Sequence, residues 1–269
     1  MKLKLSIFFV FLYLCLFPQN IVHADSRADY DFQLAKYRQN YVEFALFKSD
    51  YLQNPTLDNQ QKAILSAKQT LQARDLAKAS YARYLLSSIA AQDSGFTALD
   101  PIVIKLTNAV TFFNNEAQLS QQIINASDLK TYTLNYLKNY TIHDLSLYYG
   151  QVALKVATMV RFQINTKNEL DAMIPQLPSD RPAPLQARLN AIPTLVSQIN
   201  SQITQITSKI IPDSEEYILN ESTYFDALSA QLEIVKSLQL NLIDQLRDID
   251  LNYVQSKIWN HQSRSYQNH

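Results

Sequence analysis

The sequence is short of the residues that many common folds and active sites require. It has two glycines, Gly95 and Gly150, and a single cysteine, Cys15, in 269 residues. Glycine usually makes up about 7% of a globular chain, so the deficit argues against β-sandwiches, Rossmann-type nucleotide domains and P-loop enzymes. One cysteine also excludes disulfide frameworks and zinc sites built from several cysteines.

Charge is scarce and evenly balanced. Charged residues make up 18% of the chain, and 24 basic residues face 24 acidic ones without any basic block. Nucleic-acid binding needs a concentration of Lys and Arg, so no nucleic-acid partner is expected. The polar character comes instead from amides, with 25 Gln and 19 Asn.

Residues 1–24 have the pattern of a secretory signal peptide. Two lysines precede an apolar-rich run over residues 6–17, Pro18 ends this run, and Ala24 supplies a small residue for cleavage. The pattern predicts a mature chain that begins at Asp25 and is secreted or periplasmic. That chain would hold 22 basic and 24 acidic residues and no cysteine, which suits an oxidising compartment.

Two alternatives to cleavage are a retained membrane anchor and a lipid attached to Cys15. A spanning helix needs about 20 apolar residues, and the run over residues 6–17 is too short for one. Leu14 precedes Cys15, where lipoprotein signals place Gly, Ala or Ser. No later apolar run approaches spanning length, so we expect no transmembrane segment after cleavage.

Apolar residues recur every three or four positions along the rest of the chain, which predicts helices with one apolar face. The first helix, residues 28–52, should end before Pro55. Asp58 resembles an N-cap for a second helix that runs to about residue 92, and Asp100 resembles another before Pro101. The first helix places its stripe at Tyr30, Leu34, Tyr37, Tyr41, Phe44 and Tyr51; Phe32 and Phe47 lie off it, which allows burial of this helix on two sides.

The third helix should bury a stripe that ends at Ile124, with a break at residues 125–127. Residues 141–144 match a capping pattern, which predicts a bend before the chain continues helical to residue 174. Gly150 lies inside that stretch, where glycine is unfavourable, and it therefore indicates a close helix crossing. The stripe of the third helix comprises Val103, Leu106, Val110, Phe113, Ala117 and Ile124.

Four prolines in residues 175–184 indicate a linker. After it, isoleucines and leucines keep a heptad spacing up to Ile210, interrupted by Pro193, where we expect a kink. A turn at Pro212 then leads into a last helix over residues 214–259 with a second heptad stripe. Across that turn Ile199, Ile203, Ile206 and Ile210 should face Phe225, Leu228 and Leu232.

These patterns predict an all-α protein, an elongated antiparallel bundle of about six helices with a long C-terminal coiled-coil-like hairpin. The predicted parts are a signal peptide (1–24), an N-terminal bundle (25–174), a proline-rich linker (175–184), a helical hairpin (185–260) and a flexible tail (261–269).

No catalytic, metal or cofactor site emerges from the sequence. His143 lacks a second histidine or a carboxylate at metal-binding spacing, and we interpret it as a boundary residue near a helix cap. No serine lies in a Gly-x-Ser-x-Gly elbow. Asp244 and Asp248 share one face of a long helix, which is more typical of a solvated surface than of a glycosidase pair.

Aromatic residues are the richest candidates for function. Tyr132, Tyr136 and Tyr140 form a stripe at i, i+4 and i+8, and tyrosine favours surfaces that are apolar in body and wet at the tip. One interpretation is a partner-binding face. The other is that these rings fill the seams between helices.

The sequence therefore favours an exported, non-enzymatic helical binding or scaffold protein that acts at the cell envelope or outside the cell. Its partner would be a protein or an envelope component, and self-association is possible. Two other hypotheses remain open: a membrane-active protein of the helical pore-forming type, and a bundle that holds a small apolar ligand.

Overall fold

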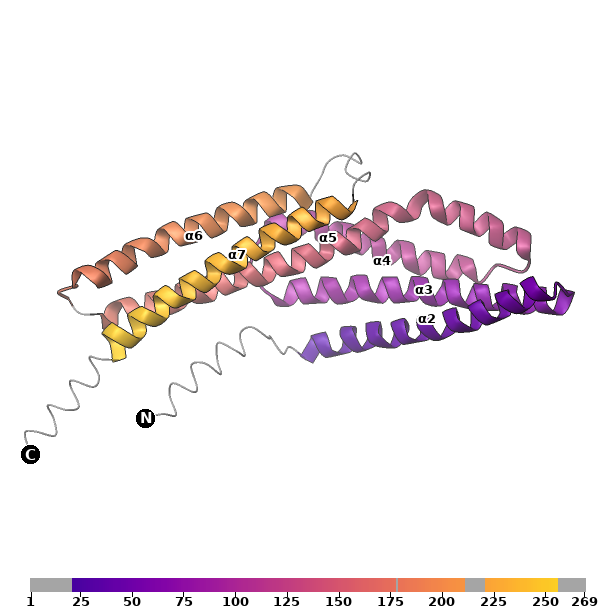
Figure 1. Cartoon of the computed structure of the whole chain (residues 1–269), viewed down its shortest axis with the longest axis horizontal. Helices are drawn as coiled ribbons and strands as arrows, with labels where there is room; N and C mark the ends of the chain where they lie inside the picture. The colour runs from indigo at the N-terminus through magenta and orange to yellow at the C-terminus, as the bar shows by residue number, and fades with distance from the viewer. Residues whose placement is uncertain (1–20, 178, 211–220, 256–269) are drawn as a thin grey trace, which may run out of the picture. The chain divides into compact units, whose positions relative to one another are not determined.

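The structure is a computed structural model that describes residues 21–177, 179–210 and 221–255. Within these ranges it contains six α-helices and no strand, which confirms the all-α prediction (Figure 1). None of the described helices offers a stretch of bilayer-spanning length and hydrophobicity. The apolar run of the predicted signal peptide, the turn at Pro212 and the tail over 261–269 lie outside the described residues.

The described chain divides into two compact units. The first contains the described residues up to Asp93 together with Thr97–Leu154, and the second contains Ser94–Phe96 and the described residues from Lys155 onward. The division falls within one long helix rather than at residues 175–184. The prediction that 25–174 and 185–260 are separate domains concerns independent folding and stays a prediction.

The first unit is built from four helices, the last of which continues into the second unit. Asn54 and Pro55 separate the first two helices, as the sequence predicts. A short 3-10 turn, η1 (Thr97–Leu99), precedes the third. The helices are α2 (Ile21–Gln53), α3 (Leu57–Ala91), α4 (Asp100–Ser120) and α5 (Ala126–Met173).

Two predicted N-caps are wrong by one or two residues. The cap of α3 is Thr56, whose hydroxyl accepts the backbone N–H of Asn59 at 3.2 Å, so Asp58 lies in the first turn. The cap of α4 is Leu99, with Asp100 inside the helix and no side-chain cap bond. Proline still lies in the first turn of α4, where a missing N–H costs nothing.

α5 continues without interruption through residues 141–144, so the capping pattern there does not begin a new helix. Tertiary contacts of His143 and Asp144, described below, keep this segment helical despite the local capping pattern. The true start of α5 is a reciprocal cap: Asn125 Oδ1 accepts the Asp128 N–H at 3.0 Å, and Asp128 Oδ2 accepts the N–H of Asn125 at 3.2 Å.

Ile124 does not continue the apolar stripe of α4. Its side chain is 83% exposed, whereas the neighbouring Ile123 is buried. The helix ends at Ser120, so the helical spacing that places a residue on the stripe no longer applies four positions later.

Small residues of α3 form much of the core of the first unit, beside large buried side chains such as Leu106. Alanines and serines line this helix where its neighbours approach, among them the fully buried Ala79, Ser80 and Ala82. Gly150 of α5 completes the packing: a Cβ added there would lie 2.8 Å from a methyl of Leu106 and 2.9 Å from a methyl of Leu85. The close crossing predicted at Gly150 is therefore confirmed, between α5, α3 and α4.

α2 packs on α3 with residues paired in opposite order along the two helices. Tyr30 packs on Tyr81 with the ring centroids 4.8 Å apart, and the hydroxyl of Thr70 donates to the carbonyl of Asn40 at 2.9 Å. Farther along α2, Tyr51 accepts a hydrogen bond from Gln60 at 3.4 Å. The face of α2 that carries Tyr30 and Tyr51 thus lies against α3, as the stripe predicts, whereas Tyr41 of the same predicted stripe is 54% exposed.

The second unit comprises the end of α5, a 3-10 turn η2 (Ile174–Gln176), α6 (Ala183–Ile210), α7 (Glu221–Ile249) and a π-helical segment η4 (Asp250–Gln255). α6 passes through Pro193 without ending there. The predicted heptad stripes are largely buried: Ile199, Ile203, Ile206 and Ile210 on α6, and Leu228, Leu232, Val235, Leu242 and Ile249 on α7.

Polar contacts also join α6 to α7. Arg188 pairs with Asp248 at 3.0 Å and donates to Gln245 at 3.0 Å. Near the other end of α6, Lys209 donates to Gln231 at 2.8 Å. Early residues of α6 thus contact late residues of α7, and Asp248 is an ion-pair partner rather than a member of a solvated acidic pair.

Candidate functional site

The tyrosine stripe predicted from the sequence lies on α5 and points into the first unit. Tyr132 and Tyr136 are buried and Tyr140 is half-buried. Their rings stack in series, with centroids 6.1 Å apart for the first pair and 5.3 Å for the second. These rings fill a seam between α5 and its neighbours, and only Tyr140 is partly exposed. A partner-binding role for the three tyrosines stays a prediction.

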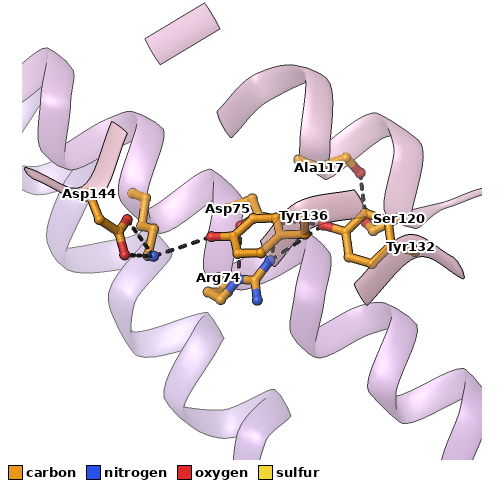
Figure 2. A network of polar contacts seen from close by, with 8 residues as sticks. Arg74, Asp75, Ala117, Ser120, Tyr132, Tyr136 and Asp144 are labelled. Atoms are coloured by element: carbon orange, nitrogen blue, oxygen red, sulfur yellow. Dashed lines mark hydrogen bonds and ion pairs between the residues drawn. The ribbon is translucent and has the colours of Figure 1, made fainter. Parts of the chain in front are cut away.

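The hydroxyl ends of the stripe contact a charged cluster on α3 (Figure 2). The Asp75 carboxylate is fully buried and accepts bonds from Arg74 Nε at 2.8 Å, Arg74 Nη2 at 3.1 Å and the Tyr132 hydroxyl at 2.8 Å. Arg74 also lies over the ring of Tyr136, with its guanidinium carbon 3.8 Å from the ring centroid. Both carboxylate oxygens of Asp75 are therefore occupied by donors.

Lys78 extends the cluster by one helical turn. Its ammonium group donates to both oxygens of Asp144, at 2.6 and 2.8 Å, and to the Tyr136 hydroxyl at 3.3 Å. Lys78 and Asp144 are each about one quarter exposed. Arg74 and Lys78 are four residues apart and therefore lie on one face of α3, which is how two cations reach the same tyrosine.

Burial and pairing shift the pKa values of the cluster in opposite ways. Burial raises the pKa of Asp75, although the bonds from Arg74 and Tyr132 counteract the shift. Burial would lower the pKa of Arg74, but the bonds and charge of Asp75 outweigh it and the pKa rises. Burial, and then the charge of Asp75, raise the pKa of Tyr132, so this phenol stays a donor.

The cluster is built to hold helices together rather than to transfer protons. A general base needs an oxygen that can reach a substrate, and Asp75 has no side-chain exposure and three donors. His143 does not add a base: it stacks on Phe112 at 4.1 Å, and burial lowers its pKa. Among the described side chains, no three His, Cys, Asp or Glu gather closely enough to hold a metal ion.

Asp75 and Lys78 were not predicted as site residues, although the sequence contains a pattern that indicates them. The three-four spacing that links Leu71, Leu85 and Ile89 on α3 also passes through positions 75, 78 and 82. Charged residues at two of these positions indicate a buried ionic contact. The partner, Asp144, could not be inferred, because it lies 66 residues away in the sequence.

A second feature of the first unit faces outward. On the side of α2 opposite to α3, Phe32, Val42 and Leu46 are 64%, 68% and 58% exposed. The two faces lie about half a turn apart, because 3.6 residues complete a helical turn. We call the exposed face the outer stripe of α2; its members are Ala28, Phe32, Ala35, Gln39, Val42 and Leu46, all of them exposed.

The outer stripe corrects the expectation that the first helix is buried on two sides. Among the described residues, the face toward α3 is the covered one, and Phe32 on the opposite face is 64% exposed. Comparison with protein-family models, with curated proteins and with solved structures gives no match.

Proposed function

We propose that this chain is an exported binding or scaffold protein without enzymatic activity, which acts at the cell envelope or outside the cell through the outer stripe of α2. The observation that supports the proposal is the exposure of three large apolar side chains along one helix face. Exposed apolar surface that forms a continuous patch is typical of interaction sites. Here the patch follows the helix for about five turns from Ala28 to Leu46.

The contrast with the tyrosine stripe supports this choice of surface. Tyr132 and Tyr136 already have aromatic, cationic and hydrogen-bonding contacts in their own chain. The side chains of Phe32, Val42 and Leu46 expose more than half of their surface. A partner could therefore cover the outer stripe without rearranging the core of the first unit.

Export and the arrangement of the helices belong to the same proposal. The outer stripe begins at Ala28, after the expected cleavage point, so processing would leave it intact. The opposite order of residue pairs between α2 and α3, and between α6 and α7, supports antiparallel neighbours within each unit. N-terminal sequencing of the exported protein should find Asp25; a chain beginning at Met1 in that material would refute processing.

Two charges placed on the outer stripe test the proposed binding surface. The double variant Val42→Asp, Leu46→Asp should lose the stable complex that the unaltered chain forms in its native extracellular or envelope fraction. Both positions are exposed, so the circular dichroism spectrum and melting temperature should change little. Ile104→Asp is the matched control, since Ile104 of α4 is also 61% exposed. Equal binding by the double variant and the unaltered chain would refute the proposed surface.

A further inference from the structure

The outer stripe of α2 has the spacing of a coiled-coil seam. Its members follow one another at intervals of four, three, four, three and four residues, the heptad pattern of positions a and d. Phe32, Gln39 and Leu46 occupy a positions, and Ala28, Ala35 and Val42 occupy d positions. A face with this spacing fits a second helix that carries the same spacing.

The charges beside the seam are complementary to those of an identical helix. Asp31 and Arg38 occupy g positions, Lys36 and Glu43 occupy e positions, and all four are exposed. In a parallel, in-register pair, each g residue lies near the e residue five positions later in the other helix. Asp31 would then meet Lys36 of the second copy, and Arg38 would meet Glu43. Twofold symmetry repeats each pair, which gives four attractive contacts.

The same charges oppose the antiparallel pair that overlaps the stripe most fully. In that register, symmetry brings Arg38 against Arg38 and Lys36 against Lys36 of the other copy. Like charges across a helical interface are unfavourable. The parallel, in-register pair therefore combines full overlap of the stripe with opposite charges at its edges.

Gln39 supports the same register. It is the one polar residue among the six members of the outer stripe, and it takes an a position. A polar side chain at a single a position fixes the register of a coiled coil, because a buried amide without a partner costs about 1–3 kcal/mol. Only an in-register parallel pair brings the two Gln39 amides together, and each amide can both donate and accept.

We infer that the outer stripe of α2 binds the outer stripe of a second copy of this chain, with the two α2 helices parallel and in register. The inference rests on the proposed function, because it names the partner of the same surface. The opposite face of α2 would remain on α3 in both copies, so each first unit would enter the dimer unchanged.

Disulfide trapping tests the orientation directly. Val42→Cys, introduced into the full chain with Cys15→Ser, should form a covalent dimer on mild oxidation, because equivalent d positions meet across a parallel in-register pair. Ile104→Cys in the same background is exposed to a similar degree on α4 and should stay monomeric on a non-reducing gel. Sedimentation of the unaltered chain over a concentration series should show a reversible dimer.

Charge reversal tests the predicted pairs. Lys36→Asp places an acid against Asp31 of the other copy twice and should weaken the dimer about tenfold. Asp31→Lys combined with Lys36→Asp restores opposite charges and should return the dissociation constant to within about threefold of the original. The exposed i,i+4 pair of Arg27 and Asp31, at 3.9 Å, is weak enough that its loss will not mask the rescue.

Each outcome separates this inference from the proposed function. A monomer at every concentration, or a dimer that neither crosslinks through position 42 nor responds to Lys36→Asp, overturns the parallel pair. If the unaltered chain is monomeric and binds a different protein that the Val42→Asp, Leu46→Asp variant no longer binds, the proposed surface stands. Only the identity of its partner is then wrong. If that variant changes no binding of any kind, both are wrong.

Discussion

The two units of this protein bury different kinds of side chain. In the second unit, α6 and α7 cover each other with isoleucine and leucine at heptad spacing, such as Ile206 and Leu228. In the first unit, α3 is lined by alanine and serine and buries Asp75 with its arginine and tyrosine partners. The burial of large apolar side chains can be predicted from their spacing in the sequence. The burial of small residues and of one paired charge cannot.

This difference predicts that the two units fail by different mechanisms. The first unit depends on close approach and on satisfied polar bonds, so it should be sensitive to the loss of a charge partner and to added volume. The second depends on filled apolar space, so it should be sensitive to truncation. Four tests, taken from the largest expected effect to the smallest, can break or sharpen this contrast.

Removal of Asp75 should have the largest effect. Asp75→Ala leaves the Arg74 guanidinium and the Tyr132 hydroxyl without their acceptor inside the first unit, and breaking one side of a buried pair costs about 3–5 kcal/mol. Chemical denaturation should show the loss. Asp58→Ala is the control, because the exposed pair of Asp58 and Lys62 contributes less than about 1 kcal/mol. Equal stability of the two variants would show that the ionic cluster does not stabilise the first unit.

Truncation of the heptad stripe should come next. Ile206→Ala and Leu228→Ala should each lower the free energy of unfolding by about 2–5 kcal/mol, because both side chains are almost completely buried. Gln205→Ala, one position off the stripe and exposed, should change little in thermal melts followed by circular dichroism. If Ile206→Ala is as mild as Gln205→Ala, the stripe faces solvent in solution.

A methyl group added at Gly150 tests the close crossing. The added carbon would lie within 3 Å of Leu85 and Leu106 methyls, and overpacking a core costs about 1–3 kcal/mol. The gain of up to about 1 kcal/mol in helix propensity offsets part of this, so Gly150→Ala should be mildly destabilising. Gly150→Val should be clearly worse. A stabilised Gly150→Ala variant would show that the crossing relaxes freely.

The pH dependence contributed by His143 should be the smallest of the four effects. Burial lowers its pKa below 6.5 in the fold, with the charge of Asp144 partly opposing the shift. A depressed pKa means that the stabilising contribution is complete above about pH 6.5 and is lost as the pH falls through the lower, folded-state value. His143→Gln should flatten this part of the stability profile in urea titrations at several pH values. An unchanged slope would assign the pH dependence to other groups.

The boundaries of helices were predictable wherever local chemistry decides them. Pro55 ends α2 and Pro101 lies in the first turn of α4, because a ring without an N–H restricts the backbone at its own position and the one before. The capping pattern at residues 141–144 failed for the opposite reason. Its signal is worth about 1 kcal/mol, and the contacts of Asp144 with Lys78 and of His143 with Phe112 outweigh it.

The candidate site was only partly predictable. The sequence showed that Tyr132 and Tyr136 share a face, since residues four apart always do in a helix. It could not show which way that face turns. Their bonds to Asp75 and Lys78 join residues 57 and 58 positions apart, and no local pattern encodes a pairing at that separation.

The sequence alone thus determined the helical content, the positions of the proline breaks and the heptad stripes of α6 and α7, because periodicity is a property of neighbouring residues. Tertiary structure decided which of the two apolar faces of α2 is covered, and that Asp75 is buried in the first unit together with leucines such as Leu85. Both decisions depend on which helix packs against which. Contacts between residues that are distant in the sequence decide this packing, so it cannot be inferred from any one segment alone.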